Sequence, residues 1–320
     1  MKGVIGTVVK ICVSAVILWA LFKNINLELF WNTVISVSPL AVIAVAFILI
    51  ANQSLSSFRW SIILRKDMDV SYLRLLSIYF IGMFFNNFLP TMVGGDIVKG
   101  YFLYRSSGRG DVSFASIFMD RYSGFTALMA ITAIALIPGY TLIAGTGLIA
   151  AFALLLGGFL CASLLIWVSG LHTWAMRILG RIHFYGINKK IDTFYNVLMS
   201  YKGRSDILVK IFICSLFIQS SVMVGYWFLG RQLGIDIGIG YYFLFIPLTT
   251  VISMLPISLA GLGLREGAFI YLFTLAGVSK EQALTLSLIY FAIMAIVSLI
   301  GGIEYLRIGG QRPQTDGSET

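Results

Sequence analysis

Charged residues are scarce in this sequence. Asp, Glu, Lys and Arg make up 12% of its 320 residues and hydrophobic residues make up 58%, whereas a soluble domain carries about 25% charged residues. This composition argues against a soluble enzyme. Several apolar runs reach the roughly 20 residues that a helix needs to cross a bilayer. The sequence therefore predicts an all-α, polytopic membrane protein.

Cysteine and histidine are also rare. The three cysteines, Cys12, Cys161 and Cys214, lie inside apolar runs, and we interpret them as small core residues rather than disulfides or metal ligands. The two histidines, His172 and His183, lie in a basic polar segment, which predicts no zinc site. Because no nucleophile–base constellation or phosphate-binding loop is visible either, we expect no catalytic residues, no metal and no cofactor.

Hydrophobic runs predict about six full membrane spans, at 4–22, 39–62, 112–138, 141–169, 207–230 and 280–306. The first resembles a signal peptide, but no small-residue cleavage pattern follows it, so an anchor is preferred. Two further apolar stretches, 71–106 and 241–278, are broken by "LPTMVGGDIVKG" (89–100) and "LPISLAGLGLREG" (255–267). Each stretch is either two spans or one re-entrant helical hairpin that enters and leaves on the same side.

The distribution of basic residues favours the hairpins. With two hairpins, almost all Lys and Arg outside the spans fall on one side, as cytoplasmic loops require, and both termini are cytoplasmic. The basic segment 171–206 then reads as amphipathic helix on the cytoplasmic leaflet, and 309–320 as a disordered cytoplasmic tail. Because this topology already accounts for the net charge of +9, we do not expect binding to nucleic acid.

The two broken stretches also belong to a repeat. When the chain is shifted by 166 positions, Leu89-Pro90 falls on Leu255-Pro256, Gly95 on Gly261 and Lys99 on Arg265. The repeated unit is span, hairpin, span, at about 39–138 and 205–304, inside a single transmembrane domain, 1–308. The two units start on opposite sides of the membrane. Inverted repeats with discontinuous helices are typical of secondary transporters.

Half-helices that meet near the middle of the bilayer direct unpaired N–H groups and positive dipole ends at a common site, which suits an anion such as phosphate. Prolines would end the inbound halves, and glycines would allow turns and a close approach of ligand. Lys99 and Arg265 would hold the phosphate. The predicted substrate-binding residues are Asn86, Asn87, Gly94, Gly95, Asp96, Lys99, Arg121, Gly261, Gly263, Arg265 and Glu266.

The charged candidates also have structural interpretations. Asp96 is either the N-cap of its half-helix or a group that meets substrate or protons. Lys99 either reaches the cytoplasmic surface or faces a cavity. Arg265 and Glu266 either serve the site, as intramembrane ionisable residues commonly do, or pair with each other. Burial would make Asp96 and Glu266 candidates for proton transfer.

Two further alternatives concern the first hairpin and the span after it. Arg121 is either the counter-ion of Asp96 or, with Asp120, part of a structural pair with other helices. Asn86 and Asn87 either satisfy backbone groups that the break leaves free or line the site.

Three motifs carry a resemblance to a known family. "NNFLPTMVGGDIVKGYFLYR" (86–105), "MDRYSG" (119–124) and "LPISLAGLGLREGAF" (255–269) resemble signatures of the lysylphosphatidylglycerol synthase transmembrane-region family, which is related to the flippase portion of the multiple peptide resistance factor. The resemblance implies an inner-membrane protein of a bacterium or archaeon that handles lipids with polar headgroups. The chain stops after 320 residues, without the aminoacyl-transferase domain of the full synthase, so we do not expect it to make lysyl-lipid.

These observations predict a flippase rather than an enzyme. It would move an anionic or lipid-linked polar headgroup, on a phospholipid or a polyprenyl-linked glycan, through a midplane site between the hairpins. One alternative is a membrane enzyme acting on a lipid phosphate, with Asp96 as base and Lys99, Arg121 and Arg265 as the phosphate clamp. Another is a lipid-binding scaffold for a separate glycosyl- or aminoacyl-transferase, with 171–206 as the interface.

Overall fold

Every regular element that the structure describes is a helix. The computed structural model describes residues 2–23, 25–65, 67–89, 93–168, 170–171, 195–255, 257–258 and 261–309, with side chains from residue 12 onward. The main helices are α1 (Lys2–Lys23), α2 (Leu27–Ile35), α3 (Pro39–Leu64), α4 (Tyr72–Phe88), α5 (Gly94–Ser107), α6 (Gly110–Ile143), α7 (Leu148–Trp167), α10 (Ser205–Gln232), α11 (Ile239–Ser253), α12 (Leu264–Leu275) and α13 (Lys280–Gly309). The prediction of an all-α fold is confirmed.

Five of these helices, α3, α6, α7, α10 and α13, are long and apolar enough to cross a membrane. The remaining predicted span, 4–22, lies in α1, and a bend of 94° separates the Cys12–Lys23 part of α1 from α2. One boundary was wrong, because α6 continues past Pro138 to Ile143. The chain turns only at Gly145 and Gly147, whose φ angles of 82° and 76° suit glycine.

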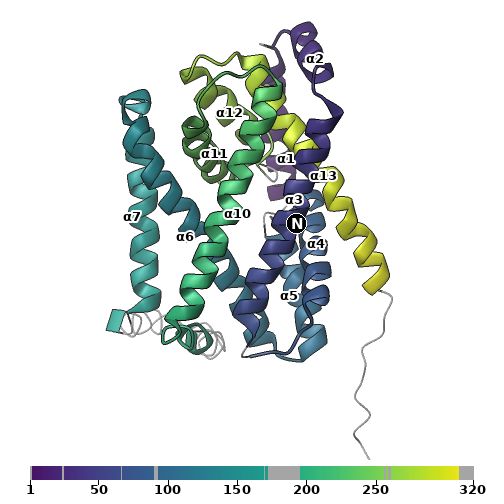
Figure 1. Cartoon of the computed structure of the whole chain (residues 1–320), viewed down its shortest axis with the longest axis vertical. Coiled ribbons are helices and arrows are strands. Elements are labelled where there is room, and N and C mark those ends of the chain that lie inside the picture. Colours follow the sequence, from purple (N-terminus) through teal and green to yellow (C-terminus); the bar gives the residue numbers. More distant parts are fainter. Residues whose placement is uncertain are drawn as a thin grey trace, which may run out of the picture.

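Both broken stretches form helical hairpins at opposite ends of the molecule. Figure 1 shows α4 and α5 (the first hairpin) in the lower half, and α11 and α12 (the second hairpin) in the upper half. In the first, Asn86 near the end of α4 accepts a hydrogen bond from the backbone N–H of Gly95 at the start of α5. In the second, Tyr242 at the start of α11 packs on Phe273 near the end of α12. The two helices of each hairpin are therefore antiparallel.

The first residues of matching helices show the repeat and the point at which its constant spacing ends. Pro39 and Ser205 open α3 and α10, 166 positions apart, whereas Gly94 and Leu264 open α5 and α12, 170 positions apart. The break in the second hairpin is longer, so the constant shift of 166 does not hold beyond it. Asp96 and Glu266 are each the third residue of their helix. The predicted equivalence of Lys99 and Arg265 was therefore wrong by about one turn.

Glycines bring the backbones of neighbouring helices close together. A Cβ atom on Gly95 would lie 2.0 Å from the carbonyl oxygen of Gly82, where α5 crosses α4. A Cβ atom on Gly301 of α13 would lie 1.9 Å from the carbonyl oxygen of Phe80 on α4. Small residues at such crossings allow the close van der Waals packing that holds membrane helices together. Both contacts fix α4 in the centre of the bundle.

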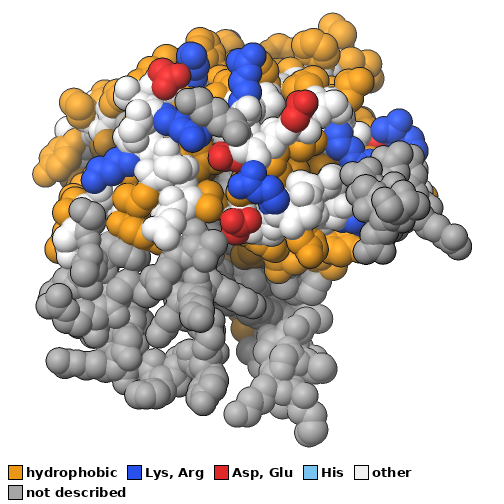
Figure 2. Space-filling model, turned by 90° about the horizontal axis from the view of Figure 1, so that it is seen from below, with side chains coloured by type: hydrophobic (Ala, Val, Ile, Leu, Met, Phe, Trp, Pro, Cys, Tyr) orange, Lys and Arg blue, Asp and Glu red, His pale blue; other side chains and the backbone are white. Residues whose placement is uncertain are grey.

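The lower end of the bundle gathers charged side chains. Figure 2, seen from below, shows Lys and Arg side chains distributed over this face with fewer acidic ones between them. Most of the predicted amphipathic segment, 172–194, and nearly all of the predicted tail, 310–320, lie outside the described residues. In the described part that precedes α10, buried Tyr201 donates a hydrogen bond to the carbonyl of Ile63 over 3.3 Å. Burial raises the pKa of Tyr201, which keeps its hydroxyl protonated.

Candidate functional site

A cavity of about 780 Å³ lies between the two hairpins and the long helices. Its walls come from α3, α4, α5, α6, α7, α10, α11 and α13. We call it the central cavity. Its charged and amide-bearing lining residues are Asn52, Gln53, Arg59, Asn86, Asn87, Lys99, Asp120, Arg121 and Gln219. Such polar groups are costly within a bilayer and are usually turned toward protein or a water-filled space.

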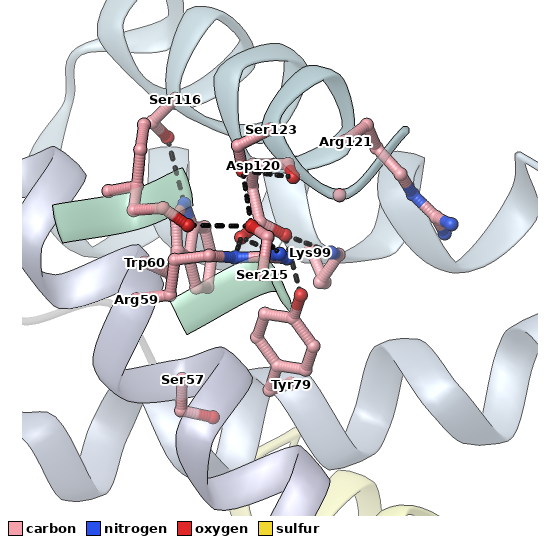
Figure 3. A network of polar contacts seen from close by, with 12 residues as sticks. Ser57, Arg59, Trp60, Tyr79, Lys99, Ser116, Asp120, Arg121, Ser123 and Ser215 are labelled. Atoms are coloured by element: carbon pink, nitrogen blue, oxygen red, sulfur yellow. Dashed lines mark hydrogen bonds and ion pairs between the residues drawn. The ribbon is translucent and has the colours of Figure 1, made fainter. Parts of the chain in front are cut away.

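Asp120 of α6 is the centre of a buried polar network (Figure 3). Its Oδ1 accepts from Arg59 Nε of α3 over 2.9 Å, and its Oδ2 accepts from the hydroxyl of Tyr79 of α4 over 2.5 Å. Arg59 Nη1 also donates to the hydroxyl of Ser215 on α10 over 2.7 Å. The carboxylate therefore ties three helices together, and its Arg59 partner reaches a fourth.

Lys99 of α5 joins this network to a second carboxylate. Its Nζ lies 3.0 Å from Asp96 Oδ1 and 3.8 Å from Asp120 Oδ2. The same ammonium group lies 4.3 Å from the ring centroid of Tyr79, a distance at which a cation is attracted to an aromatic face. Lys99 is 3% exposed, so it is held inside the bundle and does not extend to the surface.

Asp96 connects the first hairpin to α6. Its carboxylate accepts from Arg121 Nε over 2.7 Å and from Arg121 Nη2 over 3.1 Å. The prediction that Arg121 is the counter-ion of Asp96 is confirmed. The interpretation of Asp96 as an N-cap was wrong, because α5 begins at Gly94 with Val93 as its N-cap residue. Asp96 is the third residue of α5, and from there its side chain extends sideways to Arg121.

The charges of this cluster do not cancel. Arg59, Lys99 and Arg121 supply three positive charges, and Asp96 and Asp120 supply two negative ones. The side chains of Arg59, Lys99 and Asp120 are at most 7% exposed, whereas Arg121 is 51% exposed and lines the cavity. The surplus positive charge is therefore accessible through Arg121, which suits a single anionic group.

Amide side chains extend the polar wall above the charges. Gln53 and Gln219 both line the cavity, and each is the fifteenth residue of its helix, α3 or α10. Among the cavity-lining groups of the described residues, Asn52 Nδ2, Asn87 Nδ2 and the hydroxyl of Tyr290 are buried without a hydrogen-bond partner. Unpaired buried donors are costly, so a bound polar molecule or water at this wall would stabilise the protein.

Asn86 has the structural role that the sequence left open. Its side-chain oxygen accepts from the N–H of Gly95 over 2.9 Å, which satisfies one of the free amides at the start of α5. Asn86 and Asn87 also line the cavity. Gly94 and Gly95 are buried at the crossing of α5 and α4 and do not line it. Gly95 serves the close packing of two helices and not a turn.

The two charged residues of the second hairpin, Arg265 and Glu266, pair with each other. Arg265 donates to Glu266 Oε1 through Nε over 2.9 Å, and Glu266 Oε2 accepts from the N–H of Gly263 over 2.7 Å. The guanidinium of Arg265 also lies 4.2 Å from the ring centroid of Phe291. The interpretation of this pair as partners of each other is confirmed.

The predicted residues of the second hairpin lie outside the central cavity. None of Gly261, Gly263, Arg265 and Glu266 lines it. Gly263 packs instead on α1, where an added Cβ would lie 3.0 Å from Ile17 Cβ. The cavity wall on this side is formed by stacked Tyr226 and Tyr290, whose ring centroids are 3.6 Å apart.

Sequence reasoning missed several residues of the cavity. Arg59 was not among the predicted site residues, although it lies within the predicted span 39–62, and its burial marks it as part of the site. Gln53 and Gln219 carried a signal that was not used, because they are separated by the 166 positions of the repeat. Tyr79 and the pair Tyr226 and Tyr290 had no signal beyond their aromatic character.

Comparison with known proteins places these features in a family. A profile of the family described as "Lysylphosphatidylglycerol synthase TM region" matches residues 7–302, which include both hairpins and the whole cavity lining. A curated "UPF0104 membrane protein" from Methanothermobacter thermautotrophicus is 27% identical over 284 residues, in a match that covers 78% of this chain and 79% of the relative.

Proposed function

The chain belongs to the lysylphosphatidylglycerol synthase transmembrane-region family, and from this premise we propose that it moves lipids across a membrane. The substrate carries an anionic or lipid-linked polar headgroup, which passes through the central cavity while the acyl chains stay in the bilayer. Anionic phospholipids and polyprenyl-linked glycans share this chemistry. The membrane is the cytoplasmic membrane of a bacterium or archaeon, and both termini are cytoplasmic.

The observation that carries this proposal is the surplus cation in the wall of the cavity. Five ionised groups lie together between helices that are long and apolar enough to cross the membrane, and the half-exposed one is Arg121. Buried charges lower the stability of a fold unless they are paired. A protein that keeps one positive charge unbalanced at this depth is suited to an anionic ligand.

The geometry of Arg121 suggests how a headgroup is bound. Arg121 presents Nε and Nη2 to the two oxygens of Asp96, and the same fork of donors fits two oxygens of a phosphate. An arriving phosphate would take over part of this fork while Lys99, 3.0 Å away from Asp96, retains the carboxylate. Binding then exchanges one ion pair for another and leaves no charge unpaired.

The rest of the cavity suits the uncharged part of a headgroup. Asn52 and Asn87 have buried amide donors without partners among the described residues, which would hydrogen-bond hydroxyl or carbonyl oxygens. Across the cavity, α7 contributes the apolar residues Phe159, Ala162 and Ile166, which suit the start of the acyl chains. The two inverted halves would then rock around this site to expose it to one leaflet and then the other.

Transport of a labelled lipid tests the proposal. Purified protein in proteoliposomes is given phosphatidylglycerol with a fluorescent acyl chain, and arrival in the other leaflet is followed by quenching from outside. We expect Arg121→Gln to slow translocation about tenfold or more, because a hydrogen bond to a charged group is lost. Lys210→Gln is the matched control, since Lys210 is 64% exposed on α10 and pairs only with Asp206 among the described residues.

One result would refute this proposal, and two would replace it by another function. Equal rates in the wild-type protein, Arg121→Gln and empty liposomes would show that the protein does not transport this lipid. A chemically altered lipid in the same samples, detected by mass spectrometry, would indicate an enzyme acting on lipid phosphate. Loss of a partner protein in a pull-down after charge reversal at Lys189 and Lys190, with lipid movement absent throughout, would indicate a scaffold for a transferase.

A further inference from the structure

A second hollow lies at the lower end of the bundle, between the first turn of α4 and the last turn of α13. Its volume is about 450 Å³, and it shares no lining residue with the central cavity. Its polar lining residues are Ser71, Arg74, Ser77, Glu304 and Arg307. We call it the α4–α13 hollow.

Positive charge dominates the α4–α13 hollow. Arg307 pairs with Glu304 over 2.6 Å and donates to the hydroxyl of Ser77 over 3.3 Å. Arg74 makes no ion pair with any described residue and lines the same hollow as Arg307. The described lining of the hollow therefore contains two arginines, Arg74 and Arg307, and one carboxylate, Glu304, which is paired with Arg307.

The start of α4 adds hydrogen-bond donors to this charge. Ser71 is the N-cap residue of α4, but its side chain makes no capping hydrogen bond. Ser71 and Arg74 both line the hollow, so the Ser71 hydroxyl is available beside the Arg74 side chain, whereas the Arg74 N–H already donates to the Ser71 carbonyl. A helix N-terminus favours an anion by itself only modestly, and here its N-cap residue, Ser71, lines the same hollow as two arginine side chains.

The surroundings of the hollow indicate that its anion carries acyl chains. Leu73 on α4 is 72% exposed, and Ile303 and Leu306 on α13 are 66% and 78% exposed. These side chains flank the hollow on the same two helices and face outward from the bundle. Exposed leucine and isoleucine beside arginines at a helix end are typical of the boundary between acyl chains and headgroups.

We propose that the α4–α13 hollow binds the phosphate of an anionic phospholipid in the leaflet at the lower end of the molecule. Arg74 and Arg307 hold the phosphate, Ser71 donates a further hydrogen bond, and the acyl chains lie along Leu73 and Leu306. This site is separate from the proposed transport path and does not depend on it. A lipid bound there would hold α4 of the first hairpin against α13.

Native mass spectrometry of the protein in detergent tests the site. The protein is titrated with dioleoylphosphatidylglycerol, and in parallel with dioleoylphosphatidylcholine, whose choline group the arginines would repel. We expect the double variant Arg74→Gln and Arg307→Gln to bind phosphatidylglycerol about tenfold more weakly at its tightest site, because two charge-assisted contacts are lost. Arg74→Lys, which keeps the charge, should retain most of the binding.

Two controls isolate the contribution of the hollow to lipid binding. Lys210→Gln changes one exposed charge that does not line the hollow and should bind as the wild type does. Melting temperatures of all variants show whether a loss of binding is a loss of fold. Equal affinity in the double variant, or equal affinity for both lipids, would overturn the proposal. Displacement of the lipid by inorganic phosphate at similar concentration would assign the hollow to free phosphate instead. None of these results changes the test of Arg121.

Discussion

The two hairpins occupy equivalent places in the repeat but use their charges differently. In the first, Asp96 reaches from α5 to Arg121 on α6, and Lys99 links Asp96 to Asp120. In the second, Glu266 bonds to its own helix start and to its neighbour Arg265. The first arrangement needs several helices to be assembled and opens to a cavity, whereas the second is complete within one turn. The charged residues of the first hairpin thus form part of a candidate site, whereas those of the second hairpin cap the start of a helix.

The walls of the cavity show the same asymmetry. Asp120 and Tyr290 are each the eleventh residue of α6 and α13, and both line the cavity. Asp120 holds Arg59 and Tyr79, while Tyr290 stacks on Tyr226 with ring centroids 3.6 Å apart. The cavity therefore has a charged wall and an aromatic wall. A headgroup with a phosphate at one end and an uncharged polar part at the other matches this division.

The largest effect should come from Asp120→Asn. Removing this charge leaves the buried guanidinium of Arg59 without a counter-ion, and breaking one partner of a buried ion pair costs about 3–5 kcal/mol of unfolding free energy. The equivalent change in the other half, Tyr290→Phe, removes a hydroxyl that has no partner among the described residues, so its effect should be close to zero. Denaturant unfolding in detergent micelles measures both. Similar losses for the two variants would refute the division into a charged and an aromatic wall.

A smaller effect is expected for the second hairpin. Glu266→Gln leaves Arg265, whose side chain is 15% exposed, without its carboxylate, and should cost about 2–3 kcal/mol because partial exposure allows some hydration. The double variant Arg265→Met and Glu266→Gln should recover most of this loss, since it removes the orphaned charge. In the lipid-translocation assay that tests the proposed function, its rate should stay near that of the wild type. A tenfold lower rate in a stable double variant would place this pair in the proposed transport site after all.

Much of this architecture could be predicted because the signals are local. Apolar runs predicted the five helices that are long and apolar enough to cross a membrane, and the proline–glycine breaks predicted both hairpins. Two pairings, Asp96 with Arg121 and Arg265 with Glu266, followed from the rarity of charge at membrane depth, where each ionised group needs a partner.

The site itself was harder to predict because it depends on packing. Arg59 lies near the end of a span, and sequence alone does not show that it turns inward to Asp120 instead of outward to the membrane surface. The longer break before α12 displaces Arg265 by about one turn from the place of Lys99, and helix boundaries at such breaks are not visible in the sequence. Asp96, Lys99 and Arg121 were predicted as site residues. The aromatic wall of Tyr226 and Tyr290 was not predicted.

The smallest difference between the hairpins concerns the order of two substitutions at the glycines of the two breaks. Gly95 is required because a Cβ would lie 2.0 Å from the carbonyl of Gly82. Larger side chains at this position should therefore be progressively worse. Gly95→Ala should cost about 1–3 kcal/mol through overpacking, and Gly95→Asn should cost more.

Gly261 in the second break should rank the same substitutions in the opposite order. Its φ angle is 80°, a left-handed conformation that costs an L-residue roughly 1–2 kcal/mol, but that asparagine adopts more readily than alanine. Gly261→Asn should therefore be the more stable variant of the two, measured by the same denaturant unfolding. Gly108, with a φ angle of 69° and no atom within 4 Å of an added Cβ, provides a matched control in which only the backbone conformation matters. If Gly261 instead followed the order of Gly95, a steric contact and not the turn would be the reason for glycine there. Steric contact would then explain the glycine in both breaks, and the two hairpins would not differ in this respect.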